Sequence, residues 1–231
     1  MSAMYSLHIA NKNYSSWSLR PWVLMRARGI AFDEVLHRFT AGNGQDFRGI
    51  APAGKVPWLV DGETVVWDSL AIAEYLAEHH AGAWPTDARA RAWARCAAAE
   101  MHSGFANLRG QHGMNVGVRV AVARRSPEVL ADIARIEDLW NEGLLSFGGP
   151  FLAGLEFTAV DAFFAPVVFR FRTYGVTVSG AAAGYLETML AHPALKAWEV
   201  AALAEDFRDP PHEAELAQIG TVTADLRTPA R

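Results

Sequence analysis

The chain has 231 residues, which is enough for one large domain or two small ones around a substantial hydrophobic core. Apolar residues make up 51% of it and charged residues 20%, and this balance excludes an intrinsically disordered chain. The net charge of −4 and the lack of a long basic run argue against nucleic acid or an anionic membrane as a partner.

The first predicted elements are a strand and a helix that a serine-rich stretch connects. Residues 5–10 alternate between apolar and polar, which predicts a strand with one buried face. Apolar residues then recur at helical spacing as far as Gly29, a helix stop. We expect Ser18 to be the N-cap of this helix, because Pro21 would then occupy the third helical position, where its missing N–H is tolerated.

With that helix start, Ser15 and Ser16 lie on the loop that enters the helix. Free N–H groups and the positive end of the helix dipole favour a bound anion there, and the two hydroxyls are free to face a ligand. On this stretch alone, purely structural roles as capping and loop residues remain open for all three serines.

A second strand is predicted over residues 32–39, followed by a polar, glycine-rich loop over 40–55. Asp61-Gly62 separates two β-rich runs and predicts a hairpin. Pro57 cannot donate a ladder hydrogen bond, so we expect an edge position or a cis peptide bond at this residue.

The pair Asp68-Ser69 then opens a helix that ends near His80. Residues 81–85 resemble a linker, and beyond them the strand signals nearly vanish. Helices are expected over 86–108, from Ser126-Pro127 to Gly148, from Thr158 through Phe171, over 185–190 and over 193–203.

Thr158 and Asp161 have the spacing of a capping box. Cys96 is the single cysteine and is expected to be buried and inert. With one cysteine no internal disulfide can form, which fits a reducing compartment. His102, His112 and Met114 are expected to have core or surface roles. The polar tail after residue 205 is expected to pack loosely.

Three features follow one another along the chain. They are a serine cluster between a strand and a helix, then Lys55-Val56-Pro57, and then Asp68-Ser69 after a hairpin. This arrangement resembles the N-terminal domain of the cytosolic glutathione transferases, and the helical second half resembles their C-terminal domain. The resemblance implies an α/β thioredoxin-like, glutathione-binding domain over 1–80 and an all-α domain over 86–231 that forms the electrophile pocket.

The resemblance also implies which residues bind glutathione. The backbone of Val56, before Pro57, would pair with the cysteinyl part of glutathione, with Lys55 in the same site. Asp68-Ser69 would hold the γ-glutamyl end, and the chemistry agrees, because a helix N-terminus with a hydroxyl suits a carboxylate and an aspartate suits an ammonium group. An ordinary helix cap is the alternative role for this pair.

Ser15-Ser16-Trp17-Ser18 resembles the Ser-Ser-Cys-Ser motif of the zeta class, whose first serine activates glutathione. That serine corresponds to Ser15. Ser16 is kept as a second candidate for the catalytic hydroxyl and Tyr14 as a third, since other classes use a tyrosine nearer the strand. Trp17 replaces the zeta cysteine, which counts against the zeta activity, the isomerisation of maleylacetoacetate.

The resemblance therefore implies an enzyme that activates the glutathione thiolate and conjugates it to a small hydrophobic electrophile, in detoxification. It implies glutathione as the co-substrate, no metal, and a homodimer. The alternatives are a glutathione-dependent isomerase, a peroxidase or disulfide reductase, and a non-catalytic binding module. No signal peptide or membrane-spanning run is visible, so we expect a cytoplasmic protein.

Overall fold

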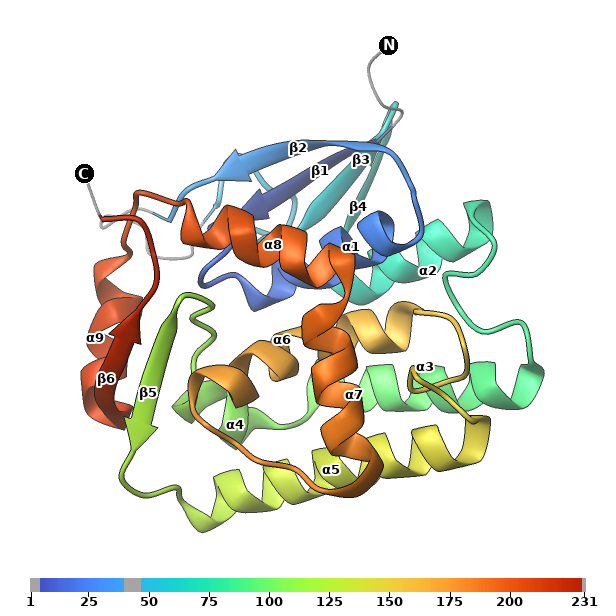
Figure 1. The fold of residues 1–231 in the computed structure, drawn as a ribbon. Coiled ribbons are helices and arrows are strands. Elements are labelled where there is room, and N and C mark those ends of the chain that lie inside the picture. The colour runs from blue at the N-terminus through green and yellow to red at the C-terminus, as the bar shows by residue number, and fades with distance from the viewer. Residues whose placement is uncertain (1–4, 40–46, 230–231) are drawn as a thin grey trace.

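The structure is a computed structural model that describes residues 5–39 and 47–229. A four-stranded sheet with its two helices packs against a larger, mainly helical layer (Figure 1). One hydrophobic cluster runs through both layers, from Tyr5 in the sheet to Ala202 near the C-terminus. Within the described ranges, no helix combines the length and the apolar content needed to cross a membrane.

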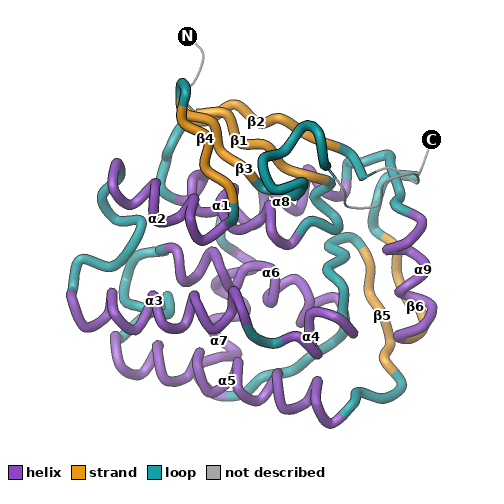
Figure 2. Tube along the Cα trace, turned by 180° about the vertical axis from the view of Figure 1, so that it is seen from behind, coloured by secondary structure: helices purple, strands orange, loops and turns teal. Residues whose placement is uncertain are grey.

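The sheet half has the predicted β-α-β, β-β-α order. Its elements are β1 (Tyr5–Ala10), α1 (Ser16–Ala27), β2 (Phe32–His37), β3 (Trp58–Asp61), β4 (Thr64–Trp67) and α2 (Ser69–His79). The strand order is β2-β1-β3-β4, with β1 parallel to β2 and antiparallel to β3. Seen from behind, α1 and α2 separate the sheet from the helical layer (Figure 2). This is a thioredoxin-like arrangement, as the sequence predicts.

The predicted N-cap of α1 is wrong. The helix begins one turn earlier, with Ser15 as its N-cap, and the Leu19 N–H donates to the Ser15 carbonyl at 3.2 Å. Pro21 therefore lies inside the helix, where its missing N–H leaves the Trp17 carbonyl without its usual partner. Burial of the helix face that carries Leu19 against the sheet outweighs this local cost.

Three details of the connections were predicted with mixed success. The Val56–Pro57 peptide bond is cis, one of the two expected alternatives. The hairpin is present, but its two turn residues are Gly62 and Glu63, since Asp61 pairs with Thr64 inside the strands. The predicted loop over 40–55 lies partly outside the described residues, and its described part, 47–55, consists of turns.

The second half is helical apart from a two-stranded sheet. Its elements are α3 (Ala88–Ser103), α4 (Ala106–Gln111), β5 (Val118–Val122), α5 (Pro127–Phe147), α6 (Ala159–Thr173), α7 (Gly180–Ala191), α8 (Pro193–Leu203), α9 (Pro210–Ile219) and β6 (Gly220–Asp225). The helix expected over 86–108 is divided at Gly104 and Phe105, where Phe105 has a positive φ of 55°. The capping box of Thr158 and Asp161 is confirmed at the start of α6.

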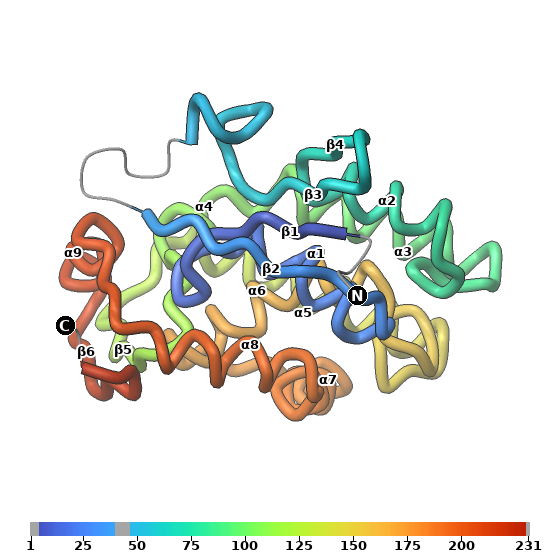
Figure 3. The backbone as a smooth tube through the Cα atoms, turned by 90° about the horizontal axis from the view of Figure 1, so that it is seen from above, coloured from blue at the N-terminus to red at the C-terminus, as the bar shows by residue number. Residues whose placement is uncertain are grey.

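Two expectations about packing in this half are wrong. Cys96 is exposed, because α3 buries a face made of alanines and Met101 and leaves the cysteine outside it. The tail is not loosely packed either: β6 pairs antiparallel with β5, and Leu216 of α9 joins Val118 and Tyr174 in a small core. Figure 3 shows α9 and the β5–β6 pair together, at the end of the molecule toward which β1 and β2 run.

Candidate functional site

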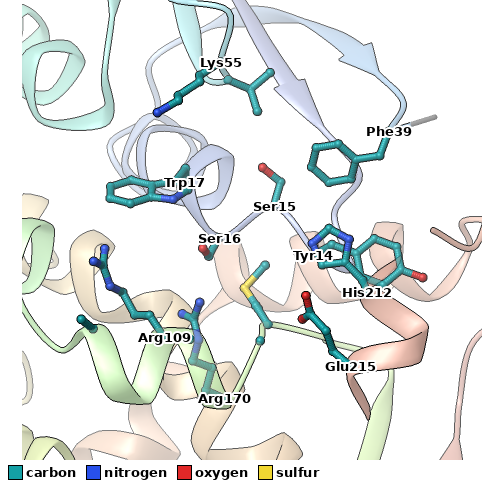
Figure 4. A pocket seen from close by; sticks show the side chains of 15 residues that line it. Tyr14, Ser15, Ser16, Trp17, Phe39, Lys55, Arg109, Arg170, His212 and Glu215 are labelled. Atoms are coloured by element: carbon teal, nitrogen blue, oxygen red, sulfur yellow. The ribbon is translucent and has the colours of Figure 1, made fainter. Parts of the chain in front are cut away.

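A cavity of about 500 Å³ lies where the start of α1 faces the helical half (Figure 4). The sheet half contributes the loop before α1 and the residues before β3, and the helical half contributes α4, α6 and α9. The side chains used below are Tyr14, Ser15, Ser16, Trp17, Lys55 and Val56 on the sheet side, and Arg109, Met114, Arg170, His212 and Glu215 opposite.

Four of the predicted site residues share this cavity. Ser15, Ser16, Lys55 and Val56 line it, although they come from segments some forty positions apart in the chain. Pro57, Asp68 and Ser69 do not line it. The fold therefore brings the serine cluster and the Lys-Val segment to one place, and the Asp-Ser pair lies outside the lining of this cavity.

Ser15 is held by a short hydrogen-bond chain. Its Oγ lies 2.7 Å from the Oγ of Ser18, which in turn accepts the backbone N–H of Ala10 at 3.1 Å. When the Ser18 hydroxyl donates to the Ser15 oxygen, the Ser15 proton is free to be donated toward the cavity. Ser18 thus supports Ser15 instead of capping the helix.

Asp68 and Ser69 are linked to the cavity through a second layer of side chains. Asp68 caps α2, accepting the Leu70 N–H at 2.7 Å, and its other oxygen lies 3.5 Å from Nε2 of His102. The buried Ser69 hydroxyl lies 3.4 Å from Nη1 of Arg20. The Arg20 guanidinium stacks 4.1 Å from the centre of the Trp17 ring, and Trp17 lines the cavity.

Three arginines make this region strongly cationic. Arg109 and Arg170 line the cavity floor (Figure 4), and Arg20 stacks on Trp17 without lining the cavity itself. Among the described residues, no carboxylate lies within ion-pair distance of any of the three. Arg20 and Arg170 are almost completely buried, and each of the three has a buried guanidinium nitrogen without a hydrogen-bond partner.

Burying these charges without carboxylate partners lowers the pKa values of the guanidinium groups. Burial, together with repulsion from Arg170 and Arg109, lowers the pKa of Arg20 to about 9. Burial likewise lowers the pKa of Arg170 to about 10, and Arg109 adds to this shift. Lys55 adds a further positive charge to the lining, and among the described lining residues Glu215 is the one carboxylate that opposes it. An anion in the cavity would relieve this imbalance.

Tyr14, the third candidate for the catalytic hydroxyl, directs that hydroxyl elsewhere. Its OH donates to Oε1 of Glu213 at 2.7 Å and accepts from Arg227 at 3.2 Å. Burial and the hydrogen bond to Glu213 raise its pKa above the ordinary tyrosine value. In Figure 4 the Tyr14 OH points toward the C-terminal segment and away from Ser15. The geometry therefore gives Tyr14 an anchoring role.

Sequence reasoning missed most of the helical wall, namely Arg109, Arg170, His212 and Glu215, and it placed Met114 in a core or surface role. One signal was available: Arg170 interrupts an apolar helix with no acidic residue one turn away to pair with it. His212 and Glu215 had no such signal, because the tail carried no clear pattern. In the part of the chain that the structure describes, no group of three His, Cys, Asp or Glu side chains is arranged to hold a metal ion.

Comparison with known proteins agrees with the fold. The family model described as "Glutathione S-transferase, N-terminal domain" matches residues 14–79, and that of the "Glutathione S-transferase, C-terminal domain" matches residues 119–199. The theta class glutathione S-transferase of Xanthomonas axonopodis pv. citri, solved with glutathione bound, superposes with a TM-score of 0.63 at 21% identity. That likeness covers 84% of this chain and 96% of that one and concerns the fold alone.

Two curated relatives are similar in sequence. A "Stringent starvation protein A homolog" of Pasteurella multocida (strain Pm70) is 25% identical over 174 residues, which are 73% of this chain and 76% of that protein. A "Glutathione S-transferase zeta class" protein of Euphorbia esula is 30% identical over 159 residues, which are 67% of this chain and 71% of that protein. Together with the two family models, this relative shows that the chain belongs to the glutathione S-transferase family.

Proposed function

We propose that the protein is a glutathione transferase that activates glutathione in the cavity beside Ser15 and conjugates it to a small electrophile. The observation that carries the proposal is the convergence of Ser15 and Val56 on one cavity at the N-terminus of a helix, in a member of this family. The glutathione bound in the Xanthomonas relative supports the choice of co-substrate. Residues 1–80 would form the glutathione-binding domain and residues 86–231 the electrophile side.

In this proposal the Val56 backbone pairs with the cysteinyl part of glutathione, with Pro57 fixing the strand start and Lys55 at the same edge. Asp68 binds the γ-glutamyl ammonium group. The α-carboxylate beside it meets the Ser69 hydroxyl at the N-terminus of α2, and the Arg20 guanidinium lies 3.4 Å behind that hydroxyl.

Activation of the thiol requires a large change in its acidity. A free thiol has a pKa of roughly 8.5, so little of it is thiolate near neutral pH. Lowering that pKa by about two units corresponds to about 2.7 kcal/mol in favour of the thiolate. A proton donated by Ser15, the N-terminus of α1 and the positive charges of Arg109 and Arg170 all act in this direction.

The other lining residues bear on the electrophile. Trp17, Phe39 and Met114 give the cavity apolar surface, which suits the expected hydrophobic electrophile. Arg109 and Arg170 add two guanidinium groups without carboxylate partners in the described chain. We therefore propose an electrophile with an apolar body and an anionic group.

A matched pair of acceptors tests the proposed function and this charge preference. We expect a chloronitrobenzene that bears a ring carboxylate to react with glutathione with a KM about 10–100-fold lower than its uncharged parent, since a hydrogen bond to a charged group contributes about 1.5–3 kcal/mol. Arg109→Gln should remove most of this preference. Arg89→Gln, which changes an exposed arginine on α3, should retain it. No conjugation of either compound, with no retention of the protein on immobilised glutathione, would refute the transferase proposal.

A second prediction concerns the γ-glutamyl end. Asp68→Ala should weaken glutathione binding by about 1–3 kcal/mol, because the ammonium group loses a charged partner. Asp68 has a φ of 74°, which strains alanine, and it caps α2, so Asp68→Asn is the control that keeps the cap and tolerates the backbone. We expect both variants to lose affinity in calorimetry. Normal affinity in Asp68→Asn would exclude a charge contact.

A glutathione-dependent isomerase is the second candidate. The zeta class relative and the cationic wall both favour it, while Trp17 in place of the zeta cysteine counts against it. Reduction of peroxides or disulfides is less favoured, since the lining contains no cysteine and Cys96 lies exposed on α3. A non-catalytic binding module would bind glutathione and fail to conjugate either chloronitrobenzene.

We further propose that the protein is a cytoplasmic homodimer. On the edge strand β4, the Trp67 side chain is half exposed and Val65 is also accessible, which offers apolar surface beside α2. Light scattering at micromolar concentration should therefore give about twice the chain mass of 25.2 kDa. The mass of a single chain would contradict this proposal.

A further inference from the structure

We propose that the C-terminal segment from Asp209 to Arg227 is a positioning element of the active site. In this role Glu213 and Arg227 anchor Tyr14, and Tyr14 fixes the adjacent Ser15 at the edge of the cavity. The inference rests on the thiol-activating role proposed for Ser15. It gives a function to a buried polar network that glutathione binding does not use.

The network is built around the Tyr14 hydroxyl. That hydroxyl donates to Oε1 of Glu213 at 2.7 Å and accepts from Nη1 of Arg227 at 3.2 Å. Arg227 also binds the Glu213 carboxylate with two hydrogen bonds of 2.6 and 2.9 Å, and the Asp225 carboxylate with two of 2.8 and 2.7 Å. Bidentate pairing of a guanidinium with two carboxylates fixes direction as well as distance.

The two central members of this network, Tyr14 and Arg227, are buried, which limits their movement. Arg227 is 8% exposed and Tyr14 is 4% exposed, so neither has bulk water as an alternative partner. Asn115 donates a further hydrogen bond to Oε1 of Glu213 at 3.2 Å. Removing one member would leave buried polar groups unpaired, and the remaining groups would have to shift to regain partners.

The rest of the loop before Ser15 is held by Glu205, which precedes this segment, and by Gly117, which is hydrogen-bonded to it. The Glu205 carboxylate accepts the backbone N–H groups of Lys12 at 2.7 Å and of Asn13 at 3.3 Å. The side chain of Asn13 accepts the Gly117 N–H at 3.2 Å, and Gly117 accepts the Leu226 N–H at 2.8 Å. The loop that carries Ser15 is therefore fixed by residues about 100 to 200 positions later in the chain.

The same segment also forms part of the cavity wall. His212 lines the cavity and stacks on the Tyr14 ring, with the ring centres 4.8 Å apart, and Asp209 holds its Nδ1. Tyr14 is directly followed by Ser15, the N-cap of α1, so a movement of Tyr14 moves the Ser15 backbone with it. A hydrogen bond from Ser15 to sulfur is sensitive to such movements, because misplacement of a reacting group by about 1 Å can cost about a hundredfold in rate.

Three variants test the role. Tyr14→Phe removes only the anchored hydroxyl, Glu213→Gln removes the charge that pairs with Arg227, and Arg227→Lys removes the bidentate geometry. Arg208→Lys is the matched control, because Arg208 immediately precedes the segment but donates to the carbonyls of Glu205, Phe207 and Thr228. Each protein is measured for kcat, for glutathione affinity by calorimetry, for the pH dependence of thiolate absorbance, and for Tm.

We expect the three network variants to lower kcat about tenfold and to raise the apparent pKa of the bound glutathione thiol, with glutathione affinity changed less than about threefold. Arg208→Lys should keep the wild-type kcat and thiol pKa. A fall in Tm with an unchanged thiol pKa and kcat would overturn the inference, since it would show a merely structural role. Tyr14→Phe keeps the ring packing, so it decides the question if a charge variant does not fold.

The wild-type protein separates this inference from the proposed function. Bound glutathione without a thiolate signal in the wild-type protein would refute the activation by Ser15, and the positioning role would fall with it. A wild-type thiolate signal that all three network variants retain would overturn the positioning role alone.

Discussion

Ser15→Ala is expected to lower the turnover of glutathione conjugation by about 10²–10³-fold, the effect of removing one preorganised donor to a developing or bound anion. The Ser15 Oγ lies 2.7 Å from the Ser18 Oγ and can accept its O–H, in which case the Ser15 proton is available for a hydrogen bond to sulfur. Such a bond is stronger to thiolate than to thiol, so its loss should raise the pKa of the bound thiol. The affinity for glutathione itself should change little.

The measurement is thiolate absorbance against pH, made side by side with Ser16→Ala and Ser18→Ala. Ser16→Ala should have a smaller effect. Ser18→Ala should lower stability by about 1–3 kcal/mol, because the buried Ala10 N–H loses its acceptor, and should raise the thiol pKa in part through Ser15. If Ser16→Ala alone abolishes the thiolate signal, the catalytic hydroxyl is that of Ser16. If no serine variant changes the signal, the serine mechanism is excluded.

The correction at α1 shows where local rules give way to tertiary structure. The rule that places proline in the first turn predicted Ser18 as the cap, and it failed because the cost of one missing hydrogen bond is small beside the burial of a helix face. The consequence is functional. With the start moved back, Ser15 becomes the N-cap, and Ser18 becomes its hydrogen-bond partner.

The elements that the sequence predicted well share a local cause. Gly29 and Gly148 end helices in the left-handed conformation, Ser126 caps α5, and Thr158 with Asp161 caps α6. Each of these depends on contacts within a few residues, which a single sequence displays. The alternation in β1 is local in the same sense, since one face of a strand is buried whatever its partner is.

The helical wall of the site is formed by contacts between residues far apart in the chain, so the sequence did not predict it. β6 becomes a strand because it pairs with β5, about 100 residues earlier in the chain, and its own sequence is short and polar. Whether Arg20, Arg109 and Arg170 have carboxylate partners depends on which residues the fold brings near them. A local sequence pattern does not predict this. The same limit explains why the sequence assigned Asp68 and Ser69 to a helix start but did not show that they lie outside the cavity lining.

The largest loss of stability is expected from Asp161→Ala. Asp161 is fully buried, and its carboxylate accepts the Leu152 N–H at 3.0 Å, the Thr158 N–H at 2.9 Å and the Tyr185 hydroxyl at 3.2 Å. It thereby ties the start of α6, the most buried helix, to the loop before it and to α7. Removing the carboxylate leaves two buried N–H groups unpaired, at about 1–3 kcal/mol each, so we expect a loss of about 2–6 kcal/mol in the free energy of unfolding.

Urea denaturation of the wild-type protein, Asp161→Ala and Asp161→Asn measures this effect. Asparagine keeps one acceptor oxygen, which can accept either the Leu152 N–H or the Thr158 N–H. The loss of unfolding free energy in Asp161→Asn should therefore be intermediate. Asp132→Ala is a matched control on the neighbouring helix α5, where the carboxylate accepts a single N–H, that of Leu108, at 2.8 Å. A cost for Asp161→Ala no greater than for Asp132→Ala would contradict the assignment.

The pH dependence of stability supplies an independent check on Asp161. Burial raises the pKa of this carboxyl from 3.8 to about 6, although its hydrogen bonds to Leu152, Thr158 and Tyr185 oppose the shift. The folded protein therefore binds more protons than the unfolded chain between these two values, and the contribution of Asp161 to stability falls as the pH rises from about 4 to about 6. Asp161→Asn cannot titrate, so the difference in free energy of unfolding between the wild-type protein and this variant should shrink over that interval. A difference that grows with pH would show instead that the hydrogen bonds outweigh burial and that the carboxylate is ionised in the folded protein.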